Sequence, residues 1–438
     1  MKSIRYRNLL IGLLGFICLI WLNAPGAALA AQKEPIKFGW IGNDNFIVHK
    51  ETQAAVKLAV EEINQKGGIL GRPVVLLTQD DRGQVPQAVA AFKKLVMSEK
   101  CRVLILGEGS EVSLANQETS ASLYKEYPHI AITVGSAAPE LSLKIAENYT
   151  KYKSFFRHHH DAINMTMIYY VEGISSIMKK AGLKKLAHIE EDAAWNKVSR
   201  EGGFGFPSMK DMFIKKGIDV VHFGVISIQE KMFLPLFEKI AASGAEFINT
   251  QLAYTDTATL IKQWAVSAAK DIPPHLGAAA GSNLLSFWGR TDGACLGIVN
   301  VESEGDFPVA PRFVPVLKDL QAKYRVGPTW MTGYAYEAVY MAKRAIEKAN
   351  GIQDVEALIK AMETVEIPHE ESFHGRVKYG SEGIEKHSLK TGLGYYNYYF
   401  GQWQGKDKMA LLFPSDQAQK INPGKGFIPP AQLRKMAK

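Results

Sequence analysis

The chain has 438 residues, of which 47% are hydrophobic and 22% are charged, the proportions of an ordinary globular protein. Its formal net charge is +8, but the basic residues are dispersed, and no basic stripe alternates with stacking aromatic residues. Nucleic-acid binding is therefore not expected. The length exceeds what one hydrophobic core usually supports, so two domains are predicted.

The N-terminus has the pattern of a secretory signal peptide, which we assign to residues 1–30. Lys2, Arg5 and Arg7 precede an apolar run that ends at Leu22, and Ala28-Leu29-Ala30 forms a small-residue cleavage site. The run is shorter than the roughly 20 apolar residues of a membrane span. We expect cleavage after Ala30 and export of a mature protein whose net charge is about +5.

A βαβ unit opens the mature chain. The alternation of residues 36–40 predicts a strand, and apolar residues at helical spacing over 54–63 predict a helix. Gly67-Gly68 ends that helix, because glycine adopts the left-handed C-terminal turn without steric cost. Pro73 then precedes the apolar run 74–77, which is typical of a parallel strand covered on both faces.

Strands and helices continue to alternate, which predicts parallel sheets with helices on both faces. The next predicted elements are helix 85–97, strand 102–107, helix 113–127, strand 130–134, helix 166–181, strand 185–189, helix 202–216, strand 219–223, helix 233–243, strand 247–251 and helix 256–269. They are followed by strands 275–277 and 297–301, helices 311–324, 332–348 and 355–362, and a strand pair around 375–379 and 395–403.

The opening unit, with its run IN.KGGI.GRPV and the paired Asp80 and Asp81, resembles the N-terminal signature of the branched-chain amino acid class of periplasmic substrate-binding proteins, which serve ABC importers. The resemblance continues along nearly the whole mature chain. It implies the type I fold: two doubly wound α/β lobes with parallel sheets, joined by three crossovers and enclosing the solute in the cleft between them. The crossovers would fall near Arg157, Val301 and Gly375.

The same resemblance groups the elements into lobes. Lobe one would comprise residues 34–157 and 301–372, and lobe two residues 158–300 and 373–415. Residues 416–438, which are rich in proline and glycine, would form an irregular C-terminal tail.

Two small-residue turns, at 107–111 and 135–138, follow predicted strands and open helices. Ligands of open α/β sheets bind at the carboxyl ends of strands, where helix N-terminal amides are free to meet a polar group. In relatives that bind α-amino acids, the equivalent turns hold the carboxylate. The resemblance assigns Ser110 and Glu111 to the first turn, and Ser136 and Ala137 to the second.

Three positions depart from the amino-acid-binding pattern. Glu111 stands about where relatives have a carboxylate-binding serine, and Ala137 stands where they have threonine. A fixed negative charge repels a carboxylate about 4 Å away by some kcal/mol. The turn 277–281, with Ala279 at its centre, lacks the acid that would hold an ammonium group. We therefore expect a neutral, aromatic or cationic solute, although Glu111 is equally explained as an acid stabilised by the helix dipole.

Aromatic and polar loop residues supply further candidates. Trp195, in the loop after Asp192, matches an aromatic wall of the relatives' site; the alternative is that it packs the lobes together. Tyr254 matches a second lining position. Asn43, after the first strand, either faces the cleft or caps the next helix.

Three consecutive histidines, residues 158–160, fall at the first expected crossover. On an extended segment only His158 and His160 point to the same side. The sequence offers no third ligand in an HExxH or CxxC pattern. Three interpretations remain: a metal site, a hinge or cleft-lining histidine with His159 as the ligand contact, or solvated side chains.

Cys101 and Cys295 each precede an apolar run, so each is expected near the start of a buried strand, either free or joined in a disulfide. The chain has no G-x-S-x-G elbow, no P-loop and no complete G-x-G-x-x-G after a strand. We therefore expect no enzymatic activity and no cofactor.

Taken together, the sequence predicts a monomeric periplasmic protein that closes on a small organic molecule and presents the closed form to an ABC permease in the inner membrane. One alternative is a sensory module of the same fold that reports its ligand to a membrane receptor. A metal-dependent enzyme is the third interpretation.

Overall fold

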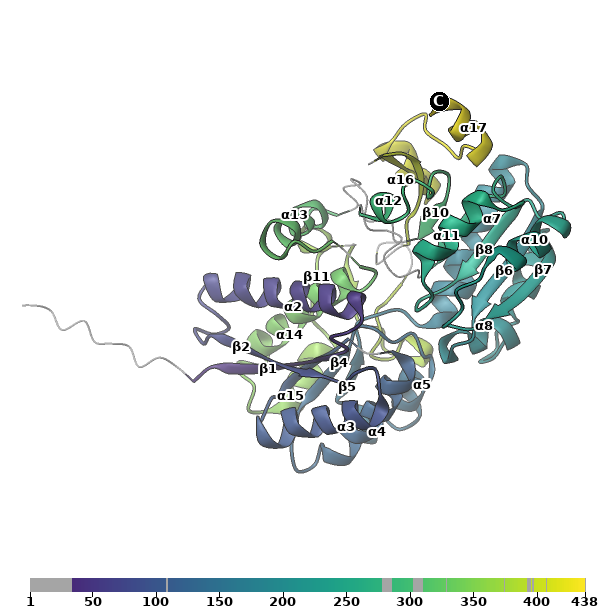
Figure 1. Ribbon diagram of the computed structural model, residues 1–438. Coiled ribbons are helices and arrows are strands. Elements are labelled where there is room, and N and C mark those ends of the chain that lie inside the picture. The colour runs from purple at the N-terminus through teal and green to yellow at the C-terminus, as the bar shows by residue number, and fades with distance from the viewer. Residues whose placement is uncertain are drawn as a thin grey trace, which may run out of the picture.

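Two α/β lobes, each built on its own sheet, make up the computed structural model (Figure 1). It describes residues 34–107, 109–277, 286–301, 310–327, 329–373, 375–391, 395, 398–406 and 408–437. The fold class predicted from the alternation of strands and helices is confirmed. The signal peptide assigned to residues 1–30 and the centre of the turn 277–281 lie outside the described residues.

The first lobe contains a five-stranded parallel sheet in the order β2-β1-β3-β4-β5. Every residue of β3 and β4, two of its three inner strands, is buried, as expected of a sheet covered on both faces. The strands are β1 (Ile36–Gly42), β2 (Val74–Asp80), β3 (Val103–Leu106), β4 (Ile130–Thr133) and β5 (Phe155–Arg157).

Helices cover both faces of this sheet (Figure 1). α2 (Ile47–Gln65), α13 (Phe313–Tyr324) and α14 (Thr332–Lys348) pack together on one face, with α15 (Val355–Met362) against α14. α3 (Val85–Lys93) and α4 (Ser110–Leu123) pack together on the other. The predicted glycine stop of α2 is present: Gly68 has φ +77°, and a Cβ there would lie 2.0 Å from the Arg72 carbonyl oxygen.

The second lobe contains a seven-stranded sheet in the order β14-β13-β10-β9-β8-β6-β7. Its parallel strands are β6 (Lys185–Glu191), β7 (Asp219–Ile226), β8 (Phe247–Gln251), β9 (Pro274–Gly277) and β10 (Val299–Val301). β13 (Phe400–Gly405) and β14 (Lys408–Phe413) add an antiparallel edge. The covering helices include α7 (Val171–Ala181), α10 (Leu234–Ala242) and α11 (Thr257–Val266).

One predicted helix of the second lobe is shorter than expected. The pattern over 202–216 predicts a helix, but its first part is not helical: a separate helix, α8 (Lys197–Glu201), ends at Gly202, which has φ +75°. α9 (Met209–Lys215) begins only after Pro207. A left-handed glycine and a proline together interrupt the helical hydrogen bonding.

The chain leaves the first sheet after β5 and returns to the first lobe after β10. Residues 375–391 stay with the first lobe, which differs from the expected crossover near Gly375. β12 (Val377–Lys378) pairs with β11 (Glu366–Ile367) and not with β13. The Arg157 guanidinium, through Nε, also donates to the Ser388 hydroxyl at 2.9 Å. The third passage therefore lies between residues 391 and 400.

The C-terminal segment is helical and anchored, where an irregular tail is expected. α16 (Ser415–Ile421) packs on β14, and α17 (Pro430–Met436) follows at the outer end of the second lobe (Figure 1). The Asn422 amide exchanges hydrogen bonds with the Leu411 backbone, at 2.9 and 3.2 Å. The prolines and glycines that predicted an irregular tail instead lie mostly in the segment between α16 and α17.

Candidate functional site

A hollow of about 460 Å³ lies between the two lobes, at the carboxyl ends of the strands. The first lobe contributes the loops after β1 and β2 and the start of α4, and the second contributes the loops after β6, β7 and β8. The described lining residues are Asn43, Asn45, Phe46, His49, Asp81, Arg82, Gly83, Gly109, Glu111, Val112, Asp192, Ala193, Ile228 and Tyr254. A molecule held here would contact both lobes.

Three of the predicted site residues, Asn43, Glu111 and Tyr254, line this hollow. Tyr254 and Phe46 face each other from opposite lobes, with ring centroids 6.0 Å apart. His49 packs edge-on against Phe46 and accepts a hydrogen bond from the Asn43 backbone N–H through Nδ1, at 2.9 Å. Burial lowers the pKa of His49 to about 3, so its imidazole is neutral.

The two lobes touch each other at the rim of the hollow. The Glu111 carboxylate accepts a hydrogen bond from the backbone N–H of Ala194 at 3.3 Å. Glu111 also lies in the first turn of α4, where the helix dipole favours an acid. The Tyr254 hydroxyl lies over Gly109, where a Cβ would stand 2.4 Å from it. Glu111 is thus placed both to face a ligand and to hold the lobes together.

The serine and alanine candidates lie deeper than the hollow. Ser110 and Ser136 are buried, and the Ser136 hydroxyl donates to the Ser110 hydroxyl at 3.2 Å. Ala137 is also buried, and its carbonyl accepts a hydrogen bond from the Ala162 N–H at 2.6 Å. None of these three is among the described lining residues. Their contacts join the ends of β3 and β4 to the first crossover.

Trp195 is buried behind the hollow, and the carboxylate of Glu191 holds it there. Its indole N–H donates to Glu191 at 3.2 Å. The same carboxylate accepts the backbone N–H groups of Ala253, Tyr254 and Thr255 at 2.9 to 3.2 Å. Burial raises the pKa of Glu191, and these hydrogen bonds oppose that rise. Glu191 therefore sets the position of the loop that carries Tyr254, a role that no sequence motif indicates.

The three histidines at the first crossover are buried, so the solvated interpretation is wrong. His158 and His160 meet the hydroxyls of Tyr379 and Tyr334 through Nδ1, at 2.9 and 3.0 Å. His159 packs against the Tyr334 ring at a centroid distance of 4.5 Å, outside the described lining of the hollow. Among the described residues, no group of three or more His, Cys, Asp or Glu side chains is placed to hold a metal ion.

Asp81 and Arg82 line the hollow but were not among the predicted site residues. Asp81 follows β2 and is fully buried, and its Oδ1 accepts the Gly83 N–H at 2.7 Å. Arg82 and Gly83 both have positive φ. The paired aspartates were visible in the sequence as part of the βαβ signature. The rule that placed Asn43 at a strand end would also have selected Asp81.

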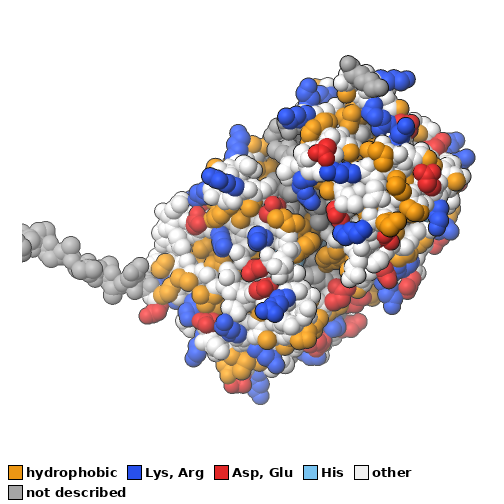
Figure 2. All heavy atoms as spheres, viewed as in Figure 1, with side chains coloured by type: hydrophobic (Ala, Val, Ile, Leu, Met, Phe, Trp, Pro, Cys, Tyr) orange, Lys and Arg blue, Asp and Glu red, His pale blue; other side chains and the backbone are white. Residues whose placement is uncertain are grey.

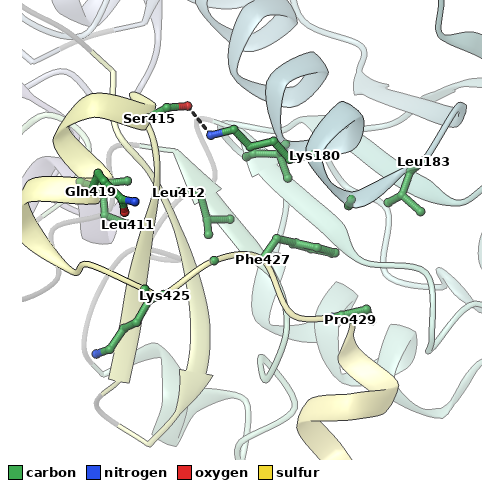
Figure 3. Close-up of a pocket in the computed structure, with 14 residues that line it drawn as sticks. Lys180, Leu183, Leu411, Leu412, Ser415, Gln419, Lys425, Phe427 and Pro429 are labelled. Atoms are coloured by element: carbon green, nitrogen blue, oxygen red, sulfur yellow. Dashed lines mark hydrogen bonds between the residues drawn. The ribbon is translucent and has the colours of Figure 1, made fainter.

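A larger hollow of about 780 Å³ lies within the second lobe, between α7, β14 and the C-terminal segment (Figure 3). Leu183, Leu411, Leu412 and Phe427 contribute apolar surface, and the Lys180 ammonium donates to the Ser415 hydroxyl at 2.5 Å. Because one lobe supplies all of its described lining, a molecule bound there would not bridge the lobes.

Comparison with known proteins identifies the family. The model of the periplasmic binding protein family matches residues 36–408. The chain belongs to this family. The family consists of substrate-binding proteins for transport, not enzymes. In the described part of this periplasmic binding protein, no helix has the length and apolar character needed to cross a membrane.

Curated relatives and solved structures agree with this assignment. The chain is 26% identical over 315 residues to a Leu/Ile/Val-binding protein homolog of Brucella melitensis, covering 71% of this chain and 78% of the relative. A benzoate-bound solute-binding protein of an ABC transporter from R. palustris matches with TM-score 0.68 and 19% identity, covering 86% of this chain and 95% of that one. An isoleucine-bound protein from Streptococcus pneumoniae matches with TM-score 0.66 and 16% identity, covering 86% and 97%.

Proposed function

We propose that this periplasmic binding protein is exported through a cleaved signal peptide, closes on a small organic solute and delivers it to an ABC permease. The observation that carries the proposal is the hollow of about 460 Å³ lined by strand-end loops of both lobes. A solute that contacts both lobes favours the closed state by its differential affinity for the two states. The permease would recognise that closed state.

A standard branched-chain amino acid is not the solute that we propose. Glu111 lines the hollow and stands in the first turn of α4, the end of the helix that would otherwise attract a carboxylate. Two like charges about 4 Å apart repel by some kcal/mol at an intermediate dielectric constant. Relatives that bind isoleucine or benzoate share the fold with this chain at 16% and 19% identity, which leaves the ligand contacts free to differ.

Native mass spectrometry of the purified protein tests this function. We expect a stoichiometric small molecule that is released when the protein is unfolded in denaturant, and that binds again to refolded protein in calorimetry. Tyr254→Ala should weaken rebinding, since Tyr254 spans the hollow, whereas Tyr149→Ala, on an exposed ring of the first lobe, should not. If deletion of the gene for this protein left uptake of that molecule unchanged, the transport role would be wrong.

A further inference from the structure

One carboxylate oxygen beside the inter-lobe hollow lacks a donor. Asp81 lines the hollow and its side chain is completely buried. Oδ1 accepts the Gly83 N–H at 2.7 Å, but Oδ2 has no hydrogen-bond partner among the described residues. A buried polar atom without a partner is costly, so such atoms are usually completed by something that binds. Asp81 therefore carries an unpartnered carboxylate oxygen at a residue that lines the hollow.

The charge around the hollow is predominantly acidic. Asp81 and Glu111 line it, and Asp192 does so at the rim, where its carboxylate lies 3.6 Å from the Arg200 guanidinium. Arg82 is the one cation among the described lining residues, and the imidazole of His49 is neutral.

Two further acids stand behind this lining. Asp44 and Asp80 add negative potential at Asp81, whose pKa is raised first by burial and then by these two neighbours. The Asp80 carboxylate already accepts the backbone N–H groups of Asp44 and Arg82, at 3.2 and 2.9 Å. A cation is therefore the charge type that this region favours, and an anion is repelled.

Aromatic rings complete the surroundings. Phe46 and Tyr254 face the hollow from opposite lobes, and their faces attract a cation that lies within about 6 Å of a ring centroid. A volume of about 460 Å³ exceeds what a bare ammonium or metal ion occupies, so it leaves room for an organic body. An amine on an apolar or aromatic body meets all three requirements. Its N–H groups can donate to Asp81 Oδ2, its positive charge matches the acidic lining, and its body can pack against the rings of Phe46 and Tyr254.

We propose that the solute is an organic cation with N–H donors, an ammonium or a guanidinium on an apolar body, and that Asp81 Oδ2 accepts its hydrogen bond. Glu111 supplies a second negative charge, and Phe46 and Tyr254 flank the body. This inference rests on the proposed function, since it names the class of molecule on which the lobes close.

Calorimetry with two probes of matched shape and opposite charge tests the proposal. 2-Phenylethylamine should bind, and 3-phenylpropionate should not. Asp81→Asn should weaken amine binding by at least about tenfold, because a charge-assisted hydrogen bond is lost. Asp319→Asn is the matched control, since it removes the same charge from an exposed site on α13 and should leave amine binding unchanged.

Asp81→Asn could also disturb folding, because Asp81 Oδ1 accepts a hydrogen bond from the turn at Gly83. A second variant therefore tests the charge at a different residue. Glu111→Gln retains an oxygen for the Ala194 N–H but removes the charge, so amine binding should weaken severalfold. Tm should fall only slightly, by what the loss of an acid at the N-terminus of α4 costs. Binding of 3-phenylpropionate in preference to the amine, or unchanged amine affinity in both variants, overturns the cation proposal while leaving a solute-binding function intact. Failure of the amine, the acid and leucine alike to bind counts against the proposed function as well.

Discussion

The hydroxyl of Tyr254, from the second lobe, lies directly over Gly109 of the first, and a Cβ on that glycine would stand 2.4 Å from the phenol oxygen. Real Cβ atoms essentially never approach another atom so closely. A side chain at residue 109 would have to displace the Tyr254 ring, so its absence permits this close approach of the two lobes. Gly109 itself offers no side chain to a solute.

Gly109→Ala should prevent full closure. We expect solute affinity to fall by about tenfold or more, since contacts from the second lobe are lost, while the unfolding midpoint changes little. Small-angle scattering should show a smaller decrease in the radius of gyration on solute addition than in the wild type. Gly289→Ala is the control, because a Cβ at that position meets nothing within 4 Å. Equal affinity for the Gly109 variant and the wild type would contradict the steric role.

Glu191→Gln should destabilise the second lobe. Replacing one carboxylate oxygen with an amide N–H₂ puts donors against the N–H groups of Tyr254 and Thr255, which the oxygens accept at about 3.0 Å. We expect a loss of about 2–4 kcal/mol in the free energy of unfolding, measured in urea.

Glu230→Gln is the matched comparison for this prediction. Glu230 also accepts backbone N–H groups, from Lys231 and Met232 at 2.8 Å, but it is exposed to water. Its replacement should lower the free energy of unfolding far less than the Glu191 change does. Similar losses for both variants would show that burial of the Glu191 carboxylate is not what makes it important.

Arg157→Met should loosen residues 375–391. The buried guanidinium donates to the Ser142 hydroxyl and to the Ile384 carbonyl, each at 3.0 Å, and it lies 3.8 Å from the Asp161 carboxylate. Removing it leaves a buried acid without its cation, for which a loss of about 3–5 kcal/mol is typical.

Hydrogen exchange in residues 375–391 measures the local effect of this change. We expect faster exchange there in the Arg157 variant. Arg376→Met, which breaks an exposed pair with Glu366, should have little effect on stability and leave exchange near Arg157 unchanged. Protected amides in the Arg157 variant would mean that other contacts hold the segment.

Glu51 should make stability depend on pH. It is half-buried on α2, its Oε2 lacks a hydrogen-bond partner among the described residues, and burial raises its pKa to about 7, against an opposing effect of Arg290. The folded state then binds the Glu51 proton more tightly than the unfolded state, so stability falls as pH rises from about 4.5 to about 7.

Glu51→Gln should remove that fall. We expect the variant to match the wild type near pH 4 and to be more stable by about 1–2 kcal/mol above pH 7, a figure reduced for solvent screening of a half-exposed group. Denaturant unfolding across this pH range measures it. Glu147→Gln, on an exposed turn of α5 (Glu140–Glu147), should leave the pH profile unchanged. A wild-type profile that stays flat would refute the role of Glu51.

The scaffold was predictable because it follows from local pattern. Gly67-Gly68 and Pro73 mark a turn whose chemistry depends on neighbouring residues only, and apolar runs such as 103–106 identify strands buried on both faces. The strand-end rule brought Asn43 and Glu111 to one hollow for the same reason, and the family resemblance added Tyr254. How deeply each candidate side chain is buried was not predictable. Trp195 lies behind the lining of the hollow because Glu191 binds its indole N–H, and His159 lies there because it packs against Tyr334.

Pairing between distant segments was also beyond the sequence pattern. The sequence predicts the strand near Gly375 that forms β12, but not its partner. That partner depends on where residues 375–391 pack, and Arg157, which is distant in sequence, binds them to the first lobe. Asp81 was missed as a site residue because an aspartate after a strand usually supports a turn. Its Oδ1 does so, and only three-dimensional packing reveals that Oδ2 does not.

Two histidines of the first crossover stay uncharged over a wide range of acidity. Burial lowers the pKa of both His158 and His159 to about 3, so in mildly acidic or neutral surroundings these rings carry no charge. A compartment outside the cytoplasmic membrane follows the acidity of the environment. Mild acid therefore adds no charge to His158 or His159, in the segment that links β5 to the second lobe.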